Sequence, residues 1–402
     1  MEQKFPGYKN AIDKTFKDAK LHGENLRNIN TTYTIPVVFH IVWNEEEERI
    51  DSSLILSQLE VLNEDFQRQN LDADSIRPVF ADIVGNPMIR FELEEIIYVE
   101  TEVLFDVNLF SGELPDEVKQ NTTGGSTAVN VEENLNIWVC KLQPIEFAGE
   151  FAGQLLGFAY PPNDLDNWPI ELMVPDPDFA GVVVDYRTMG RGNPFTLQIF
   201  PGEQTNLPLG RTVVHEVGHY LGLRHTWGDV MFPNFDSCSE DDGIEDTPNS
   251  GQQTTFHCNT AQNTCGAGPN DLPDMIENFM DTADETCRNS FTQGQIDLMR
   301  GVLELQRCGL IDSCENVMVG VRDLIPIDID IFPNPSSGLF QVNTDFSNLS
   351  EFNIRIFNTN GQIISANIED GNIDLSTFPD GVYYMIGQTS SRSIREKFIK
   401  IQ

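Results

Sequence analysis

Basic residues are scarce in this chain of 402 residues, where 25 Lys and Arg stand against 63 Asp and Glu for a formal net charge of −38. Such an excess argues against nucleic acids and anionic membranes as partners, because both carry negative charge themselves. It indicates a very soluble protein, and acidic side chains would also suit calcium. Solubility alone is enough to explain the composition.

Long apolar runs are missing as well. No stretch is apolar for the length that a membrane span requires. The first thirty residues lack the apolar core of a signal peptide, which on its own would indicate a cytosolic protein.

The cysteines contradict a cytosolic location. Four of the seven, Cys238, Cys258, Cys265 and Cys287, fall in one loop-rich stretch. Such a stretch is typical of disulfide stapling in an oxidising compartment. A zinc site made of cysteines is the alternative, but no tight Cys-x-x-Cys pair supports it. We therefore expect a secreted or cell-surface protein whose export signal has been removed or lies outside this sequence.

The pattern of apolar residues divides the chain into three parts. Residues 1–33 are polar with a weak helical pattern, which predicts a leader or the remnant of a pro-segment. Residues 34–320 alternate β-branched runs with helical patterns, which predicts a mixed sheet domain. Residues 326–402 carry short alternating runs and a turn signal at Asn360-Gly361, which predict a small β-sandwich.

Within the second part, strands are expected at residues 35–43, 89–98, 136–140, 156–160 and 181–186. A helix should begin after a cap at Asp51 or Ser52 and bury Leu54, Leu56, Leu59, Leu62 and Phe66. Further helices are expected at residues 209–221 and at 292–307, the latter capped by Thr292. A long loop separates these two helices, and loops of this length are usually functional or stapled. Cys308 and Cys314 could close a small loop after the last helix.

In the third part, strands are expected at residues 339–342, 353–357, 362–365, 381–386 and 397–401.

The residues that point to chemistry are HEVGHYLGLRH at positions 215–225. Side chains four apart on a helix share a face, so His215 and His219 can offer two imidazoles to one ion. Glu216 lies beside that face, where it can hold a metal-bound water without being a ligand. Gly222 can adopt a positive φ and end the helix, and His225 can then return as a third ligand. Three protein ligands leave one position for water, which is typical of a catalytic zinc site.

Chance is the competing explanation for this motif. A bare H-E-x-x-H occurs by accident in many proteins, and a pair of histidines on a helix is often only polar packing. The added Gly222 and His225 favour the metal site. So does the concentration of half of the six histidines of the chain in these eleven residues.

The extended motif resembles the zinc signature of the metzincin metallopeptidases. Residues 278–281 (NFMD) look like the metzincin methionine turn, with Met280 as its methionine. Residues 210–229 resemble the pappalysin family in particular, in its cytophagalysin and ulilysin-like branch. Residues 37–43, 62–66 and 135–140 extend that resemblance.

The resemblance implies an α+β catalytic domain: a twisted five-stranded mixed sheet, an active-site helix and a loop-rich lower half. Residues 156–160 would be the antiparallel rim strand that holds an extended peptide substrate.

The family also implies two disulfides and calcium in the lower half. The disulfides would be Cys238–Cys265 and Cys258–Cys287, each contributing about 2–4 kcal/mol by restricting the unfolded chain. Cys140 would remain free and buried. The calcium candidates are Asp242, Glu245, Asp246 and Thr247, although a merely solvated acidic loop explains these residues equally well because no fixed calcium spacing is visible.

Two positions depart from the family pattern. Many members have a tyrosine two residues after the turn methionine, where it is thought to stabilise the transition state, and this chain has Thr282. Some relatives are kept latent by a cysteine of the pro-segment, and residues 1–33 contain none.

The last part of the chain resembles a type A C-terminal sorting domain of the type IX secretion system. The motifs are FPNPSSG at 332–338, IFNTNGQ at 356–362, FPDGVYY at 378–384 and the basic end 395–400. An ordinary immunoglobulin-like module is the alternative. The resemblance implies export with the secretion machinery as a partner of residues 326–402.

These observations predict a secreted zinc endopeptidase that acts on extended protein substrates. Zn²⁺ held by His215, His219 and His225 would acidify a bound water, and Glu216 would serve as the general base. A surface-displayed binding or adhesion protein with a degenerate site is the second hypothesis, favoured only by Thr282. The motif alone also allows a metal-dependent hydrolase of a non-peptide bond.

Overall fold

The structure is a computed structural model of the whole chain. It describes residues 8–26, 30–107, 114–147, 149–162, 177–228, 238, 241–266, 272–312, 325–326, 330–343, 354–358, 363–364, 367–369, 372–388 and 392–401. The chain divides into two compact units, one holding the described residues up to Asp312 and the other those from Ile325 onward. The domain limits expected from the sequence remain predictions.

The first unit is built on a five-stranded sheet with the order β2-β1-β3-β7-β6. Its strands are β1 (Tyr33–Trp43), β2 (Ile89–Glu100), β3 (Leu135–Cys140), β6 (Gly157–Ala159) and β7 (Val182–Asp185). Strands β2, β1, β3 and β7 are parallel, and β6 pairs antiparallel with β7 at the edge. The predicted α+β class with a mixed five-stranded sheet is confirmed.

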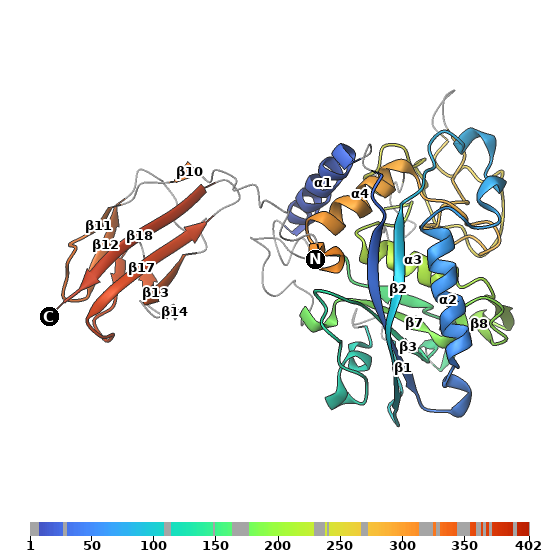
Figure 1. The fold of residues 1–402 in the computed structure, drawn as a ribbon, viewed down its shortest axis with the longest axis horizontal. Helices are drawn as coiled ribbons and strands as arrows, with labels where there is room; N and C mark the ends of the chain where they lie inside the picture. Colours follow the sequence, from blue (N-terminus) through green and yellow to red (C-terminus); the bar gives the residue numbers. More distant parts are fainter. Residues whose placement is uncertain are drawn as a thin grey trace. The chain divides into compact units, whose positions relative to one another are not determined.

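The helices of this unit are α1 (Tyr8–Leu26), α2 (Ser52–Asp65), α3 (Arg211–Tyr220) and α4 (Gln293–Glu304). Helix α3 packs against α2 and against strands β6 and β7, and Figure 1 shows α1 alongside α4. That close approach requires glycine, because a Cβ on Gly301 would lie 1.9 Å from the carbonyl oxygen of Ala19. Two hairpins were not expected: β4 (Ile145–Phe147) with β5 (Glu150–Gly153), and β8 (Thr196–Phe200) with β9 (Glu203–Asn206).

The caps of α2 and α4 follow the sequence. The Asp51 carboxylate accepts the N–H groups of Ser53 and Leu54, and Thr292 forms a capping box with Gln295.

One predicted apolar position of α2 is wrong. Leu56 is 46% exposed, and the buried side of the helix is formed by Ile55, Gln58, Val61 and Leu62. Gln58 is buried because its amide donates to the carbonyl of Gly210 and accepts from the N–H of Gly190. Leu54 and Leu59 pack against the core and Leu62 and Phe66 are buried, so Leu56 is the one predicted position that faces outward.

The second unit contains two sheets, with strand orders β10-β18-β17-β13-β14 and β11-β12-β16-β15. The strands are β10 (Ile325–Pro326), β11 (Asp330–Phe332), β12 (Leu339–Asn343), β13 (Arg355–Asn358), β14 (Ile363–Ile364), β15 (Asn367–Glu369), β16 (Asn372–Asp374), β17 (Gly381–Gln388) and β18 (Arg392–Lys400). Phe340 and Ile373 of one sheet share a core with Met385 and Phe398 of the other, so the unit is a small sandwich. The expected turn at Asn360-Gly361 lies outside the described residues.

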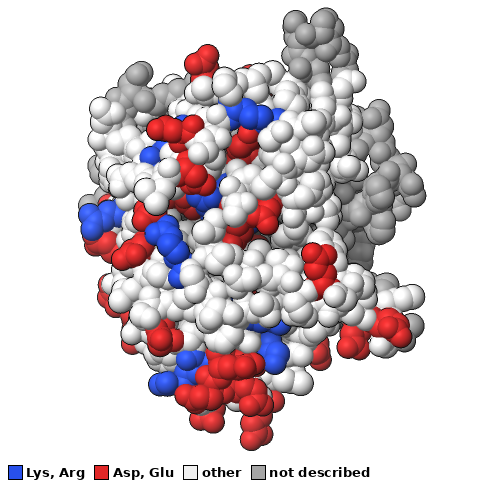
Figure 2. All heavy atoms as spheres, turned by 90° about the vertical axis from the view of Figure 1, so that its right-hand side faces the viewer, with Lys and Arg blue, Asp and Glu red and all other residues white. Residues whose placement is uncertain are grey.

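The acidic excess is visible at the surface. Figure 2 shows acidic side chains gathered at the lower end of one face, with a few basic side chains among them. None of the described helices has the length and apolar character needed to cross a membrane.

Candidate metal centre

Helix α3 carries the first two histidines of the motif. Val213, Val214 and Val217 are fully buried and fix the helix against the core. Gly222 has φ +95° and ends the helix, as the sequence indicates, and the N–H of Leu223 then bonds to the carbonyl of Gly218 at 3.0 Å. This turn brings His225 back beside the helix.

The three imidazoles converge on one point. The Nε2 atoms of His215, His219 and His225 lie 3.1 Å from one another in every pair. Tetrahedral zinc with bonds of about 2.0–2.1 Å to nitrogen would place its ligand atoms roughly 3.3 Å apart. The spacing of the three Nε2 atoms therefore fits a zinc ion.

The tautomers support the same conclusion. Nδ1 of His215 lies 2.7 Å from the carbonyl oxygen of Phe279, and Nδ1 of His219 lies 2.8 Å from that of Leu223. A carbonyl only accepts, so Nδ1 is protonated in both rings and Nε2 presents a lone pair. Burial and the neighbouring imidazoles also hold the pKa of His215 well below its usual value. The Nε2 atoms of His215 and His219 are therefore available as ligands, and Nε2 of His225 meets them at the same point, so the three could hold a metal ion.

Glu216 lies on the same helix and is buried. Burial raises the pKa of Glu216 to about 8, and the positive charge of Arg288 opposes that rise. A cation held by the three histidines would lower this pKa further, because an opposite charge favours the carboxylate. Glu216 also touches the rim of the sheet: a Cβ built on Gly157 would lie 2.8 Å from its Cγ. Strand β6 therefore lies directly against the carboxylate side chain.

Met280 lies beneath the helix, as the methionine-turn resemblance suggests. It is fully buried, and a Cβ on Gly218 would lie 2.4 Å from its sulfur. Asn278 shapes this turn by accepting the N–H of Met280 at 2.9 Å and by exchanging hydrogen bonds with the Gln295 amide. The turn carries Phe279, whose carbonyl orients His215. Sequence reasoning missed this acceptor because a backbone carbonyl leaves no mark on residue type.

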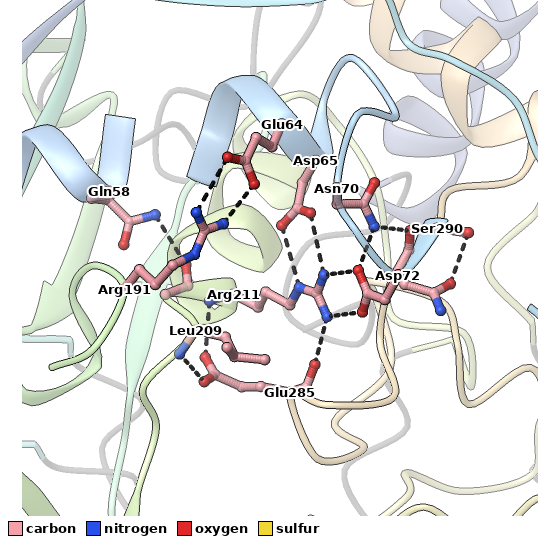
Figure 3. Close-up of polar contacts among 12 residues, drawn as sticks. Gln58, Glu64, Asp65, Asn70, Asp72, Arg191, Leu209, Arg211, Glu285 and Ser290 are labelled. Atoms are coloured by element: carbon pink, nitrogen blue, oxygen red, sulfur yellow. Dashed lines mark hydrogen bonds and ion pairs between the residues drawn. The ribbon is translucent and has the colours of Figure 1, made fainter. Parts of the chain in front are cut away.

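A network of ion pairs and hydrogen bonds at the start of α3 was also not predicted from the sequence (Figure 3). The Arg211 guanidinium pairs with Asp72 at 2.6 Å and with Asp65 at 3.4 Å, and it donates to the carbonyl of Glu285. The Glu285 carboxylate in turn accepts the backbone N–H groups of Leu209 and Arg211, both at 2.9 Å. Gly210 has no side chain that could cap α3, so Glu285, which is distant in sequence, caps the helix instead. This network ties α3 to α2 and to the loop after Met280.

The lower half of the unit is stapled. Cys238 pairs with Cys265 and Cys258 pairs with Cys287, the two pairs that the family resemblance implies. Cys140 is free and buried at the end of β3. Cys308 is disulfide-bonded, and Cys314 lies outside the described residues.

The acidic loop at residues 241–247 contains two buried carboxylate oxygens without a well-aligned hydrogen bond. Oδ1 of Asp242 accepts the N–H of Ile244, whereas its buried Oδ2 has only the nearby Thr247 side chain as a partner. Oδ2 of Asp246 accepts the N–H of Gly294, and its Oδ1 is unsatisfied. Burial raises the pKa of Asp242 well above its usual value, although the Ile244 N–H and the nearby Thr247 hydroxyl oppose this. Glu245, the remaining calcium candidate, is exposed.

Comparison with known proteins places this centre in a family. Residues 198–304 match the family model described as pregnancy-associated plasma protein-A, which defines the pappalysins. Mature mirolysin of Tannerella forsythia in complex with a cleaved peptide is 32% identical with a TM-score of 0.57, covering 72% of this chain and 98% of that chain. The chain belongs to the pappalysin family of metalloproteases.

Other relatives agree with this assignment. A promirolysin mutant of T. forsythia is 30% identical with a TM-score of 0.61, over 78% of this chain and 95% of that chain. Extracellular metalloproteases of Arthroderma otae and Arthroderma benhamiae are 37% and 29% identical, over 27% and 44% of this pappalysin. The matches span only 37% and 55% of the lengths of those two curated relatives.

The second unit has its own match. Residues 330–402 match the model described as a secretion system C-terminal sorting domain. Together with the extracellular relatives, this match indicates that the pappalysin is secreted.

Proposed function

We propose that this pappalysin is a zinc-dependent endopeptidase that cleaves extended protein substrates. The observation that carries the proposal is the convergence of three Nε2 atoms beside helix α3, which also carries the buried carboxylate of Glu216. The mirolysin complex supports it, because that relative holds a cleaved peptide.

The residues of this chain would divide the work as follows. His215, His219 and His225 would hold zinc, which supplies a Lewis acid and acidifies water. Glu216 would accept the proton of the attacking water and pass it to the leaving amine. Among the described residues, strand β6 is the edge of the sheet beside Glu216, so its outer side can pair with an extended peptide.

The test is cleavage of a denatured protein such as casein by the purified chain. We expect cleavage that 1,10-phenanthroline abolishes and that added zinc restores, because the chelator competes with the three histidines for the metal. Product ends identified by mass spectrometry would show internal cuts. Absence of cleavage with zinc and calcium supplied, and with the residues before β1 removed, would contradict the proposal.

A degenerate binding protein is the alternative, and Thr282 is the observation that favours it. Its hydroxyl donates to the carbonyl of Thr254 at 2.7 Å, so it braces the turn at residues 254–256. Zinc binding without cleavage in the test above would favour this alternative.

Residues 1–33 would act as a pro-segment. Arg224 lies in sequence between the candidate ligands His219 and His225. Its guanidinium carbon lies 4.9 Å from the ring centroid of Phe16 on α1, and the same ring packs against Gly243 of the acidic loop. The proform of mirolysin matches more of this chain than its mature form does, 78% against 72%.

Residues 326–402 would engage the type IX secretion machinery.

Calcium would bind at the acidic loop. The buried Oδ2 of Asp242 and Oδ1 of Asp246, neither of which has a well-aligned hydrogen bond, are hard ligands of the kind that calcium prefers, and bound calcium would relieve the cost of burying them. Asp242→Asn should remove a calcium-dependent rise in melting temperature, which at 100 times the Kd corresponds to about 2.7 kcal/mol. Glu203→Gln, which removes one exposed acidic charge, is the control and should keep the rise. An unchanged calcium response in Asp242→Asn would exclude Asp242 as a ligand.

A further inference from the structure

A lysine is completely buried behind the rim strand. Lys119 lies in a short 3₁₀ helix (Asp116–Lys119), and its side chain has no exposed surface. Its ammonium pairs with the Asp116 carboxylate at 2.9 Å and donates to the carbonyl of Phe179 at 3.0 Å. Burial lowers the pKa of Lys119 to about 8 while Asp116 opposes that effect, so the ammonium is charged at neutral pH.

Aromatic rings wall this ammonium. The Lys119 Nζ lies 4.3 Å from the ring centroid of Tyr160 and 4.8 Å from that of Phe158. Trp138 and Phe179 complete the wall at 5.6 and 5.9 Å. Cations attract aromatic faces, and the attraction is strongest where water is excluded. Two of these rings belong to β6 and to the residue directly after it.

The two faces of β6 meet different partners. Neighbouring residues of a strand point to opposite sides, so Phe158 faces Lys119 while Gly157 faces the helix side. Phe158 and Trp138 share one buried cluster, and Gly157 lies against Glu216. A shift of Phe158 away from Lys119 would therefore move Gly157 relative to Glu216.

Tyr160, the residue directly after β6, is held by the same Asp116 carboxylate that pairs with Lys119. The Tyr160 hydroxyl donates to the other Asp116 oxygen at 2.6 Å. The Tyr160 carbonyl accepts from Arg307, which also donates to the carbonyl of Tyr220 at the end of α3. The Lys119–Asp116 pair thus holds the strand on one side, and Arg307 links it to the active-site helix on the other.

We propose that Lys119 is a positioning residue that fixes rim strand β6 at the distance from Glu216 that peptide cleavage requires. This inference rests on the proposed peptidase function. It assigns Lys119 no contact with substrate, and its effect passes through Phe158 and Tyr160.

The test compares three variants of the full chain. Lys119→Met keeps the length of the side chain and removes its charge. The double variant Asp116→Asn with Lys119→Met also removes the carboxylate that the single change leaves unpaired. Lys141→Met is the matched control, because Lys141 also forms an ion pair, with Glu48 at 3.2 Å, but lies at the end of β3.

Hydrogen exchange gives a readout that does not depend on activity. In Lys119→Met and in the double variant, the amides of β6 should exchange roughly tenfold faster or more, while those of β1 and α3 keep their protection. Unchanged exchange in β6 would overturn the proposal whether or not the wild-type chain cleaves peptides.

Kinetics give the second readout. For peptides long enough to pair with β6, kcat/KM should fall by about tenfold to a hundredfold, with most of the loss in KM and with zinc content unchanged. The double variant should recover melting temperature without recovering KM. Recovery of both together would reduce Lys119 to a structural role and contradict the proposal. If the wild-type chain cleaves nothing, the peptidase function fails, and the exchange experiment still decides whether Lys119 holds β6 in place.

Discussion

Glu216→Gln is expected to lower the rate of peptide hydrolysis by about 10³-fold, within the usual contribution of a general acid–base residue. The amide keeps the size of the side chain, so the contact of Glu216 with Gly157 and the packing of α3 are preserved. It cannot accept a proton from water. The loss should therefore fall on kcat, and it is measured with a defined peptide at saturating concentration.

Two controls make this result specific. Zinc content should stay at one ion per chain, because Glu216 is not among the three side chains whose Nε2 atoms converge. Glu203→Gln removes a carboxylate from an exposed strand and should leave the rate unchanged. A Glu216→Gln protein that loses its zinc would assign the residue a role in holding the site together. One that retains full turnover would show that another group is the base.

The parts of this centre that could be predicted from sequence are those set by local geometry. Helical spacing alone puts His215 and His219 on one face, and Gly222 alone supplies the positive φ that returns His225. The caps at Asp51 and Thr292 are local for the same reason. These features depend on residues within one or two turns of each other, so residue type and spacing specify them.

The parts that could not be predicted depend on contacts between distant segments. Glu285 caps α3 from 74 residues away in sequence, and it would otherwise read as one more surface acid in a very acidic chain. Lys119 reads as an ordinary solvated lysine until the aromatic residues of later segments surround it. Gln58 reads as a solvated side chain until Gly190 and Gly210, more than 130 residues away, supply its buried partners. In each case a tertiary contact overrides the local pattern.

The rim strand is the place where these distant contacts act on the candidate site. The sheet presents β6 as its edge, Lys119 holds the outer face of the strand, and Glu216 meets its inner face at a glycine. A glycine at this point lets the backbone approach the carboxylate side chain more closely than any other residue would allow. The position of β6 is thus fixed from both sides.

Gly157→Ala should therefore lower kcat/KM by about a hundredfold, because a displacement near 1 Å in an active site can cost that much. The added methyl group would lie 2.8 Å from the Cγ of Glu216 and 2.8 Å from the backbone oxygen of Val183. Neither neighbour can yield freely, since Glu216 is buried and Val183 belongs to β7, which is paired on both sides by β3 and β6. Either the strand or the carboxylate must move.

Gly153→Ala is the matched control, because its methyl group would meet only Ile145 at 3.9 Å, an ordinary contact. It changes the same residue type four positions earlier and should keep wild-type kinetics. Comparison of kcat and KM separates the two ways in which Gly157→Ala can act. A loss mainly in KM means that the strand has moved and pairs poorly with the peptide, whereas a loss mainly in kcat means that Glu216 has turned away from the attacking water. Equal activity in the two variants would show that β6 can retreat without consequence, and that the close contact between Gly157 and Glu216 has no part in catalysis.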